Sequence, residues 1–146
     1  MLPFTIELRA GLPLTEQIVY AAKKAVVMGQ LRTGDAFPSV RQLSQELRIN
    51  PNTAHKVIAA LVQEGVLVTT PAIGSIVAAP TEGNRRERAE VLGAELERTV
   101  VEAKRMGMTL DEVQDGLVSQ WEKLSPSPKT HERHRNPRTD PAIRPS

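Results

Sequence analysis

The sequence predicts a mostly α-helical chain with one small β-hairpin, an α+β fold class. Apolar residues recur at helical spacing in three segments before residue 66 and in two segments after residue 84. Between these two groups, β-branched residues flank a turn at residues 71–74, which predicts two short strands. The end of the chain, residues 125–146, is polar and rich in proline, so we expect a disordered tail there.

Composition narrows the class of protein. A length of 146 residues allows one modest domain with appendages, and the absence of cysteine excludes disulfides and cysteine-ligated zinc. There is no run of 18 apolar residues and no signal-peptide pattern, so we expect a cytoplasmic protein without a membrane span. The net charge is +2 over residues 1–80, −3 over residues 81–124 and +3 over residues 125–146. The mildly basic first segment suits a domain that binds an anion.

The first elements are a strand and a helix. Residues Phe4 to Leu8 alternate between apolar and polar, which predicts a short half-buried strand that Gly11 ends. Pro13 suits the start of a helix that runs to about Met28, and Gly29 ends it. The apolar stripe of this helix consists of Leu14, Ile18, Ala21, Ala22 and Ala25.

The next segment predicts two helices joined by a tight turn. Ser39 can cap the first helix, and Gln42 three residues later completes a capping-box pattern. After the turn, Asn50 is a good N-cap and Pro51 suits the first helical position of the second helix. Gly65 ends that helix.

The second helix of this pair has two different faces. Its core stripe is predicted to be Ala54, Val57, Ile58 and Leu61. The opposite face carries Asn52, His55, Lys56 and Ala59. Such a polar, partly cationic face can enter a DNA major groove, with small Ala59 allowing a close approach. The alternative is an ordinary solvated face on a surface helix.

A β-hairpin follows the helices. Residues 66–70 and 75–77 are strand-like and are joined by a turn that contains Gly74. Three helices followed by a hairpin is the order of elements in a winged helix-turn-helix domain, which we place at residues 1–80.

Residues 12–77 resemble the N-terminal domain of GntR-type bacterial transcription regulators. The matching residues are Pro13, Leu14, Gln17, Ile18, Gly29, Leu31, Gly34, Asp35, Pro38, Ser39, Arg41, Leu43 and Asn50 to Thr53. The overall length and the short helical C-terminal part resemble the small YtrA-like subgroup. The resemblance implies a dimeric DNA-binding repressor with a palindromic operator. It also implies DNA contacts by Arg41, Asn52 and Thr53.

The candidate DNA-binding residues are Ser39, Arg41, Asn50, Asn52, Thr53, His55, Lys56, Gly74 and Ser75. Several have simpler alternatives, because Ser39 and Asn50 can act as caps and Arg41 can pair with Glu46 or Glu64. The hairpin departs from the family pattern, since it lacks the usual arginine and leaves only the Gly74 backbone and the Ser75 hydroxyl to contact phosphate. For Ile73 we favour closing the hairpin over inserting into the DNA groove.

A linker at residues 80–84 precedes two amphipathic helices. The first runs from about Arg85 to Met106, and the second begins at Thr109 in a capping box with Glu112. Together, residues 85–124 predict an antiparallel hairpin that cannot bury both of its apolar stripes alone. We favour a twofold dimer over folding back onto the first domain. The expected dimer-interface residues are Leu92, Leu96, Val100, Leu117 and Trp121.

These patterns predict a sequence-specific DNA-binding transcription regulator, expected to act as a repressor that binds an inverted-repeat operator as a homodimer. The expected partners are double-stranded DNA and a second copy of the chain, and the sequence does not identify whether a small-molecule effector exists. The alternative function is a winged-helix module for protein–protein contact, which would not show DNA binding with steep salt dependence. No catalytic constellation is present, so we expect no enzyme activity, catalytic residue, metal or cofactor.

Overall fold

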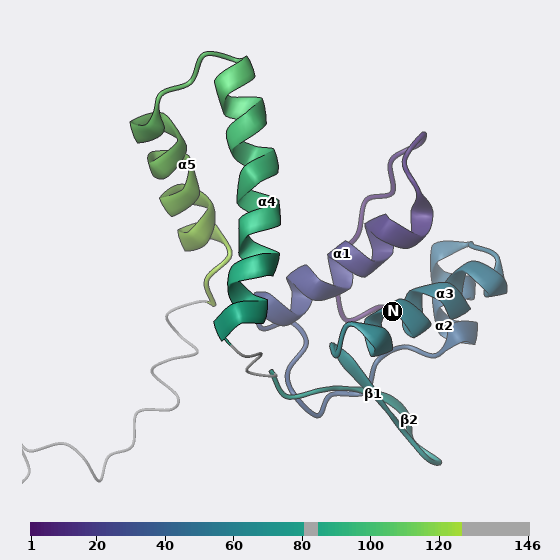
Figure 1. Ribbon diagram of the computed structural model, residues 1–146. Coiled ribbons are helices and arrows are strands. Elements are labelled where there is room, and N and C mark those ends of the chain that lie inside the picture. Colours follow the sequence, from purple (N-terminus) through teal and green to yellow (C-terminus); the bar gives the residue numbers. More distant parts are fainter. Residues whose placement is uncertain (81–84, 127–146) are drawn as a thin grey trace, which may run out of the picture.

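The computed structural model describes residues 1–80 and 85–126 as five helices and one antiparallel β-hairpin (Figure 1). The elements in chain order are α1 (Leu14–Val27), α2 (Val40–Leu47), α3 (Pro51–Gln63), β1 (Leu67–Thr70), β2 (Gly74–Val77), α4 (Arg85–Arg105) and α5 (Leu110–Lys123). The predicted α+β fold class is therefore confirmed. The predicted linker residues 81–84 and residues 127–146 of the predicted tail lie outside the described residues. In the part that is described, no helix is both long and apolar enough to cross a membrane.

The core lies around α3, which packs against α1, α2 and β1. Fully buried side chains include Ile18 of α1, Leu43 of α2, Val57 and Leu61 of α3, and Leu67 of β1. All buried residues of this cluster lie within residues 4–77, so the first part of the chain has a hydrophobic core of its own.

The predicted helix caps are present. The Ser39 hydroxyl accepts a hydrogen bond from the Gln42 N–H at 3.1 Å, and the Asn50 side chain accepts one from the Asn52 N–H at 2.8 Å. Thr109 and Glu112 form both bonds of a capping box at the start of α5. These bonds satisfy N–H groups that a helix leaves unpaired in its first turn, which fixes where α2, α3 and α5 begin.

The prediction of a strand over residues 4–8 is wrong. Phe4 is buried and its ring stacks on Phe37, with the ring centroids 5.9 Å apart, but the segment has no neighbouring strand with which to pair. The Gln17 side-chain amide binds the following backbone instead, accepting from the Arg9 N–H at 2.8 Å and donating to the Arg9 carbonyl at 3.0 Å. The alternation of residues 4–8 thus reflects a segment without strand pairing, in which Phe4 is buried and Ile6 packs partly buried against the core.

The hairpin pairs Leu67 with Val77 at its base and Thr70 with Gly74 at its tip. The other edge of β2 is paired with residues 34–37. There, the Phe37 N–H donates to the Ser75 carbonyl at 2.8 Å, and the Val77 N–H donates to the Asp35 carbonyl at 2.9 Å. The hairpin is therefore held from both sides of β2, and one of those sides leads directly into α2.

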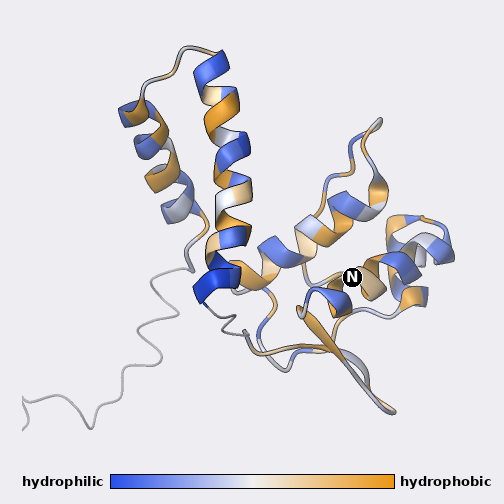
Figure 2. Ribbon diagram, viewed as in Figure 1, coloured by the Kyte–Doolittle hydropathy of each residue, from blue (hydrophilic) through white to orange (hydrophobic). Residues whose placement is uncertain are grey.

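Helices α4 and α5 form the predicted hairpin of two helices, and apolar residues recur along both of them (Figure 2). Many of these apolar side chains are exposed. Ala103 of α4 is buried, whereas no residue of α5 is. An apolar groove of about 670 Å3 runs between the two helices. The prediction that this hairpin cannot bury both of its stripes alone is confirmed.

Candidate nucleic-acid interface

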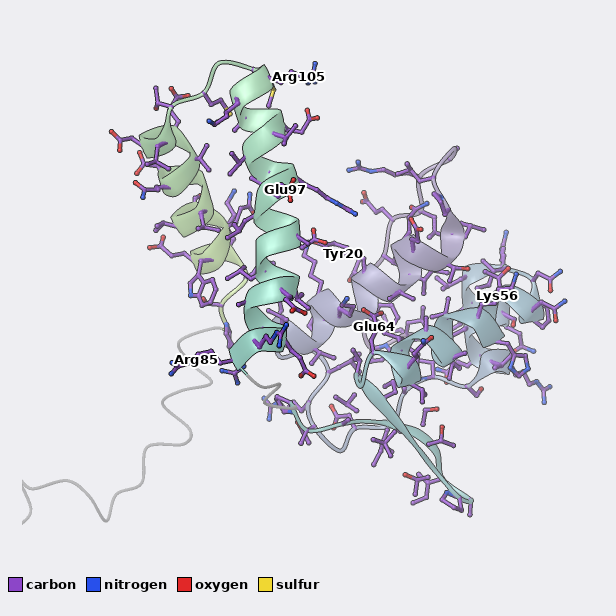
Figure 3. The ribbon with its side chains drawn as sticks, viewed as in Figure 1. Tyr20, Lys56, Glu64, Arg85, Glu97 and Arg105 are labelled. Carbon is purple, nitrogen blue, oxygen red and sulfur yellow. The ribbon has the colours of Figure 1, made fainter. Side chains whose placement is uncertain are left out.

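The two faces of α3 lie as the sequence predicted. Ala54, Val57 and Leu61 are fully buried, whereas Asn52 and Lys56 are exposed. His55 and Ala59 are exposed on the same side, and Thr53 is half-buried. Lys56 lies on the part of the domain farthest from α4 in the view of Figure 3. The exposed face can thus approach a long partner such as a DNA duplex without interference from the C-terminal helices.

The two caps keep part of their hydrogen-bonding capacity. Ser39 uses its oxygen as an acceptor for the Gln42 N–H, which leaves its O–H available to donate. Asn50 uses its carbonyl oxygen for the Asn52 N–H, which leaves the two hydrogens of its amide. Both residues are exposed. A capping role and a phosphate contact are therefore chemically compatible at each position.

Arg41 does not form the surface ion pairs that the sequence left open. Glu64 pairs with Lys23 at 2.8 Å, and Glu46 pairs with the amino group of Met1. Arg41 is exposed, and within residues 1–80 and 85–126 it has no ion pair. Its guanidinium is available for an external anion, which a carboxylate partner would have competed for.

Arg48 is a further cation of this region that is not among the candidates named from the sequence. It is exposed and directly follows the last residue of α2. Its backbone φ of 54° is a left-handed conformation that residues other than glycine rarely adopt. Together with Arg41 and Lys56 it gives the α2–turn–α3 unit three cations, whereas Glu46 is the sole acidic residue there. The left-handed φ of Arg48 is visible only in the structure, so no local signal in the sequence marks it as a candidate.

The tip of the hairpin carries the remaining candidates. Gly74 is exposed with a φ of 97°, and Ser75 is half-buried. The backbone of Ile73 closes the turn by donating to the Thr70 carbonyl at 3.3 Å, but its side chain is 67% exposed. Ile73 therefore closes the hairpin through its backbone, while its side chain remains in solvent.

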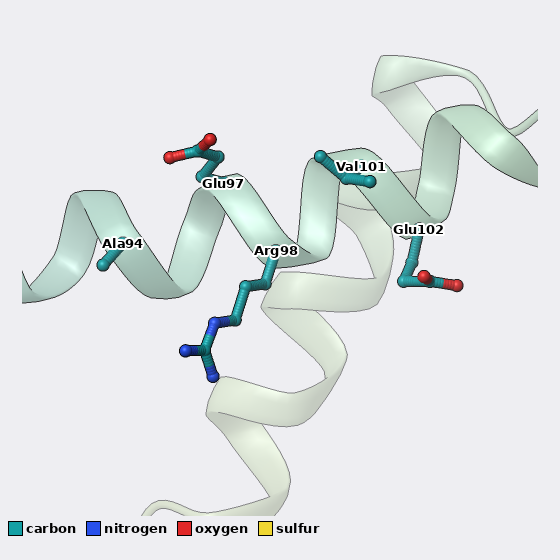
Figure 4. A pocket seen from close by; sticks show the side chains of 5 residues that line it. All are labelled: Ala94, Glu97, Arg98, Val101 and Glu102. Atoms are coloured by element: carbon teal, nitrogen blue, oxygen red, sulfur yellow. The ribbon is translucent and has the colours of Figure 1, made fainter.

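The expected dimer-interface residues are all exposed. Leu96 and Leu117 line the groove between α4 and α5, and Leu117 also lines an adjoining recess together with Trp121 and with Val27 of α1. A third, shallow recess lies along α4 alone and is lined by Ala94, Glu97, Arg98, Val101 and Glu102 (Figure 4). The apolar surface of the hairpin is thus spread over both helices.

Comparison with known proteins agrees with this geometry. The family model described as bacterial regulatory proteins, gntR family, matches residues 14–77. The chain is 27% identical over 113 residues to the HTH-type transcriptional repressor YtrA of Bacillus subtilis, which covers 77% of this chain and 87% of that protein.

Solved structures show the same fold. A transcriptional antiterminator from Listeria monocytogenes superposes with a TM-score of 0.72 at 28% identity, covering 83% of this chain and 91% of that chain. A GntR family transcriptional regulator from the same organism gives a TM-score of 0.60 at 20% identity, covering 77% of this chain and 98% of that chain. Residues 14–77 therefore form a winged helix-turn-helix domain that matches the GntR family of bacterial transcription regulators, which is not a class of enzymes.

Proposed function

We propose that the protein is a sequence-specific repressor that binds an inverted-repeat DNA operator as a homodimer. The observation that carries the proposal is the exposed face of α3, where Asn52, His55 and Lys56 lie opposite a fully buried apolar stripe. Asn is suited to bidentate hydrogen bonding with adenine, and Lys is suited to phosphate or guanine. Arg41 at the start of α2 adds a cation without an ion pair in the described part of the chain.

Base reading and phosphate contact can be separated with two variants on the same face. Asn52→Ala is expected to lower affinity for the selected operator by about 1–3 kcal/mol while leaving affinity for random DNA unchanged, because base contacts specify sequence. Lys56→Ala is expected to weaken binding to both duplexes and to flatten the salt slope by about one unit per half-site. Equal losses for Asn52→Ala on both duplexes would remove that residue from base recognition.

The homodimer rests on the apolar surface of the α4–α5 hairpin. Leu92, Val101 and Trp121 are each more than half exposed, and Leu110, Leu117 and Val118 add to the same hairpin. Soluble monomers rarely expose contiguous apolar patches of this kind, and a second copy would cover them around a twofold axis. We therefore assign DNA binding to residues 1–80 and dimerisation to residues 85–124. Two linked DNA-binding domains would then engage two half-sites about 34–36 Å apart, or a multiple of that distance.

Salt dependence distinguishes this function from a protein–protein module. Contacts to phosphates release counterions, so the affinity for DNA should fall steeply between about 50 and 200 mM salt. A winged domain that binds only a protein would show weak DNA binding at every salt concentration. The measurement is fluorescence anisotropy of a labelled duplex across a salt series.

A further inference from the structure

We propose that Ile73 inserts into the DNA minor groove beside the half-site and acts as an apolar wedge. This inference rests on the proposed function and adds a specificity determinant to it. The wedge makes affinity depend on how easily the flanking base step unstacks, because the cost of opening a step differs between sequences.

The first argument is the chemistry of the hairpin. Residues 66–80 contain no charged side chain, so the hairpin cannot make an ionic contact with phosphate. Its exposed side chains are uncharged, and the large ones are apolar, since Ile73 is 67% exposed at the tip and Val68 is 49% exposed on β1. Isoleucine is among the residues that DNA-bending proteins insert between base steps, and its β-branched side chain has few rotamers to lose on insertion.

The second argument is the backbone at the tip. Ala72 has a φ of 68° and Gly74 has a φ of 97°. A left-handed conformation is unfavourable for alanine, which adopts it only where its surroundings impose it. Here it allows the Ile73 N–H to reach the Thr70 carbonyl, which closes the turn while the Ile73 side chain stays in solvent. The turn thus leaves Ile73 as the most exposed large apolar side chain of the hairpin.

The third argument is the rigid connection between the hairpin and the helix-turn-helix. Residues 34–37 pair with β2 through the Phe37 N–H to Ser75 carbonyl bond of 2.8 Å and the Gly34 N–H to Val77 carbonyl bond of 2.9 Å. The same segment runs through Pro38, which is buried, into Ser39, the N-cap of α2. A duplex that docks on α2 and α3 would therefore meet the tip at a fixed place.

The shape of the molecule supports DNA as the occupant of the tip. The tip of the β1–β2 hairpin projects away from the body of the domain and away from α4 and α5 (Figure 1). The exposed apolar side chain at the tip belongs to the same domain as α3, whose exposed face is proposed to bind DNA. It is not part of the proposed dimer surface on α4 and α5. The walls of the minor groove present sugar C–H groups and base edges, which an uncharged tip can contact without leaving a charge unpaired.

The experiment uses the full-length protein and 30-bp duplexes that carry the inverted repeat it selects from a random pool. The base step at the expected wing position is varied between TA, which unstacks easily, and a stiff A-tract step. The parent protein is expected to prefer TA. Ile73→Ala is expected to weaken binding to the TA duplex about tenfold, to abolish the preference between duplexes, and to leave the salt slope unchanged.

Two matched variants control for structure. Ile73→Val should keep most of the preference, because it retains a β-branched apolar side chain. Val68→Ala removes an exposed apolar side chain from the same hairpin, and it should leave affinity and preference unchanged. Retained preference in Ile73→Ala, or an equal loss in Val68→Ala, refutes the wedge alone. A parent protein that selects no sequence refutes the proposed function and the wedge together.

Discussion

Replacing Trp121 by alanine tests the proposed dimer most directly. Trp121 lies near the end of α5 and is 75% exposed in the single chain, although it lines a recess with Val27. In a monomer, its removal should therefore cost little folding free energy. In a dimer that covers this surface, the same substitution should remove one of the main anchors of the interface, because Trp is one of the residue types enriched among binding hot spots.

The expected magnitude follows from the exposed area of this side chain. A Trp side chain buries up to about 250 Å2, and three quarters of that area amounts to about 190 Å2 still exposed in the monomer. At about 25 cal/mol per Å2 the dimer could gain about 4–5 kcal/mol per subunit if this area became fully buried. Ordering costs and incomplete burial reduce this value, and we expect Trp121→Ala to cost about 2–4 kcal/mol of dimerisation free energy.

Sedimentation equilibrium over a concentration series measures this quantity. The parent protein is expected to be dimeric at micromolar concentration, and Trp121→Ala is expected to raise the dimer dissociation constant about 30-fold or more. Val68→Ala, which removes an exposed apolar side chain from the hairpin of the first domain, is the matched control and should leave the constant unchanged. A parent protein that sediments as a monomer, or a Trp121→Ala variant that dimerises like the parent, would refute the reasoning.

Two further predictions concern the winged domain. A chain that ends at Pro80 should still fold cooperatively, since its core lies within residues 4–77. It should be monomeric and should lose most operator affinity, because one domain lacks the avidity of two. Sedimentation of this shortened chain as a dimer would contradict the assignment of dimerisation to residues 85–124. Arg48→Gly should raise the urea midpoint by relieving about 1 kcal/mol of left-handed strain, yet weaken DNA binding by removing a cation. Arg48→Ala is the control, because it removes the same cation and keeps the strain, so it should weaken DNA binding without raising the midpoint.

Local chemistry made the helices and the exposed face of α3 predictable. Ser39 and Asn50 mark the starts of α2 and α3, and each forms its capping bond with a residue two or three positions away. The apolar spacing of Ala54, Val57 and Leu61 determines which face of α3 is buried. These signals depend on residues near one another in sequence. They can therefore be recognised in the sequence without knowledge of the tertiary fold.

Features that depend on distant pairing were not predictable. The alternation of apolar and polar residues over residues 4–8 predicted a strand. A β-strand, however, requires a partner strand with which to form hydrogen bonds. Here the Gln17 amide binds the adjacent Arg9 backbone instead. The pairing of residues 34–37 with β2 had no local signal, because Gly34-Asp35 reads as a turn. The availability of the Arg41 guanidinium for an external anion likewise depends on a distant pairing, because Glu64 forms its ion pair with Lys23.

The small number of cations limits how this protein can bind DNA. If Arg41, Arg48 and Lys56 each met one phosphate in both subunits of a dimer, about six counterions would be released and the logarithmic salt slope would be about −5. A single domain with three such contacts would have a slope of only about −3, and correspondingly weak affinity at physiological salt. Its uncharged hairpin could not compensate by ionic contacts. Useful operator affinity then has to come from joining two domains through α4 and α5 and from contacts that do not depend on charge, such as those of Asn52 and Ile73.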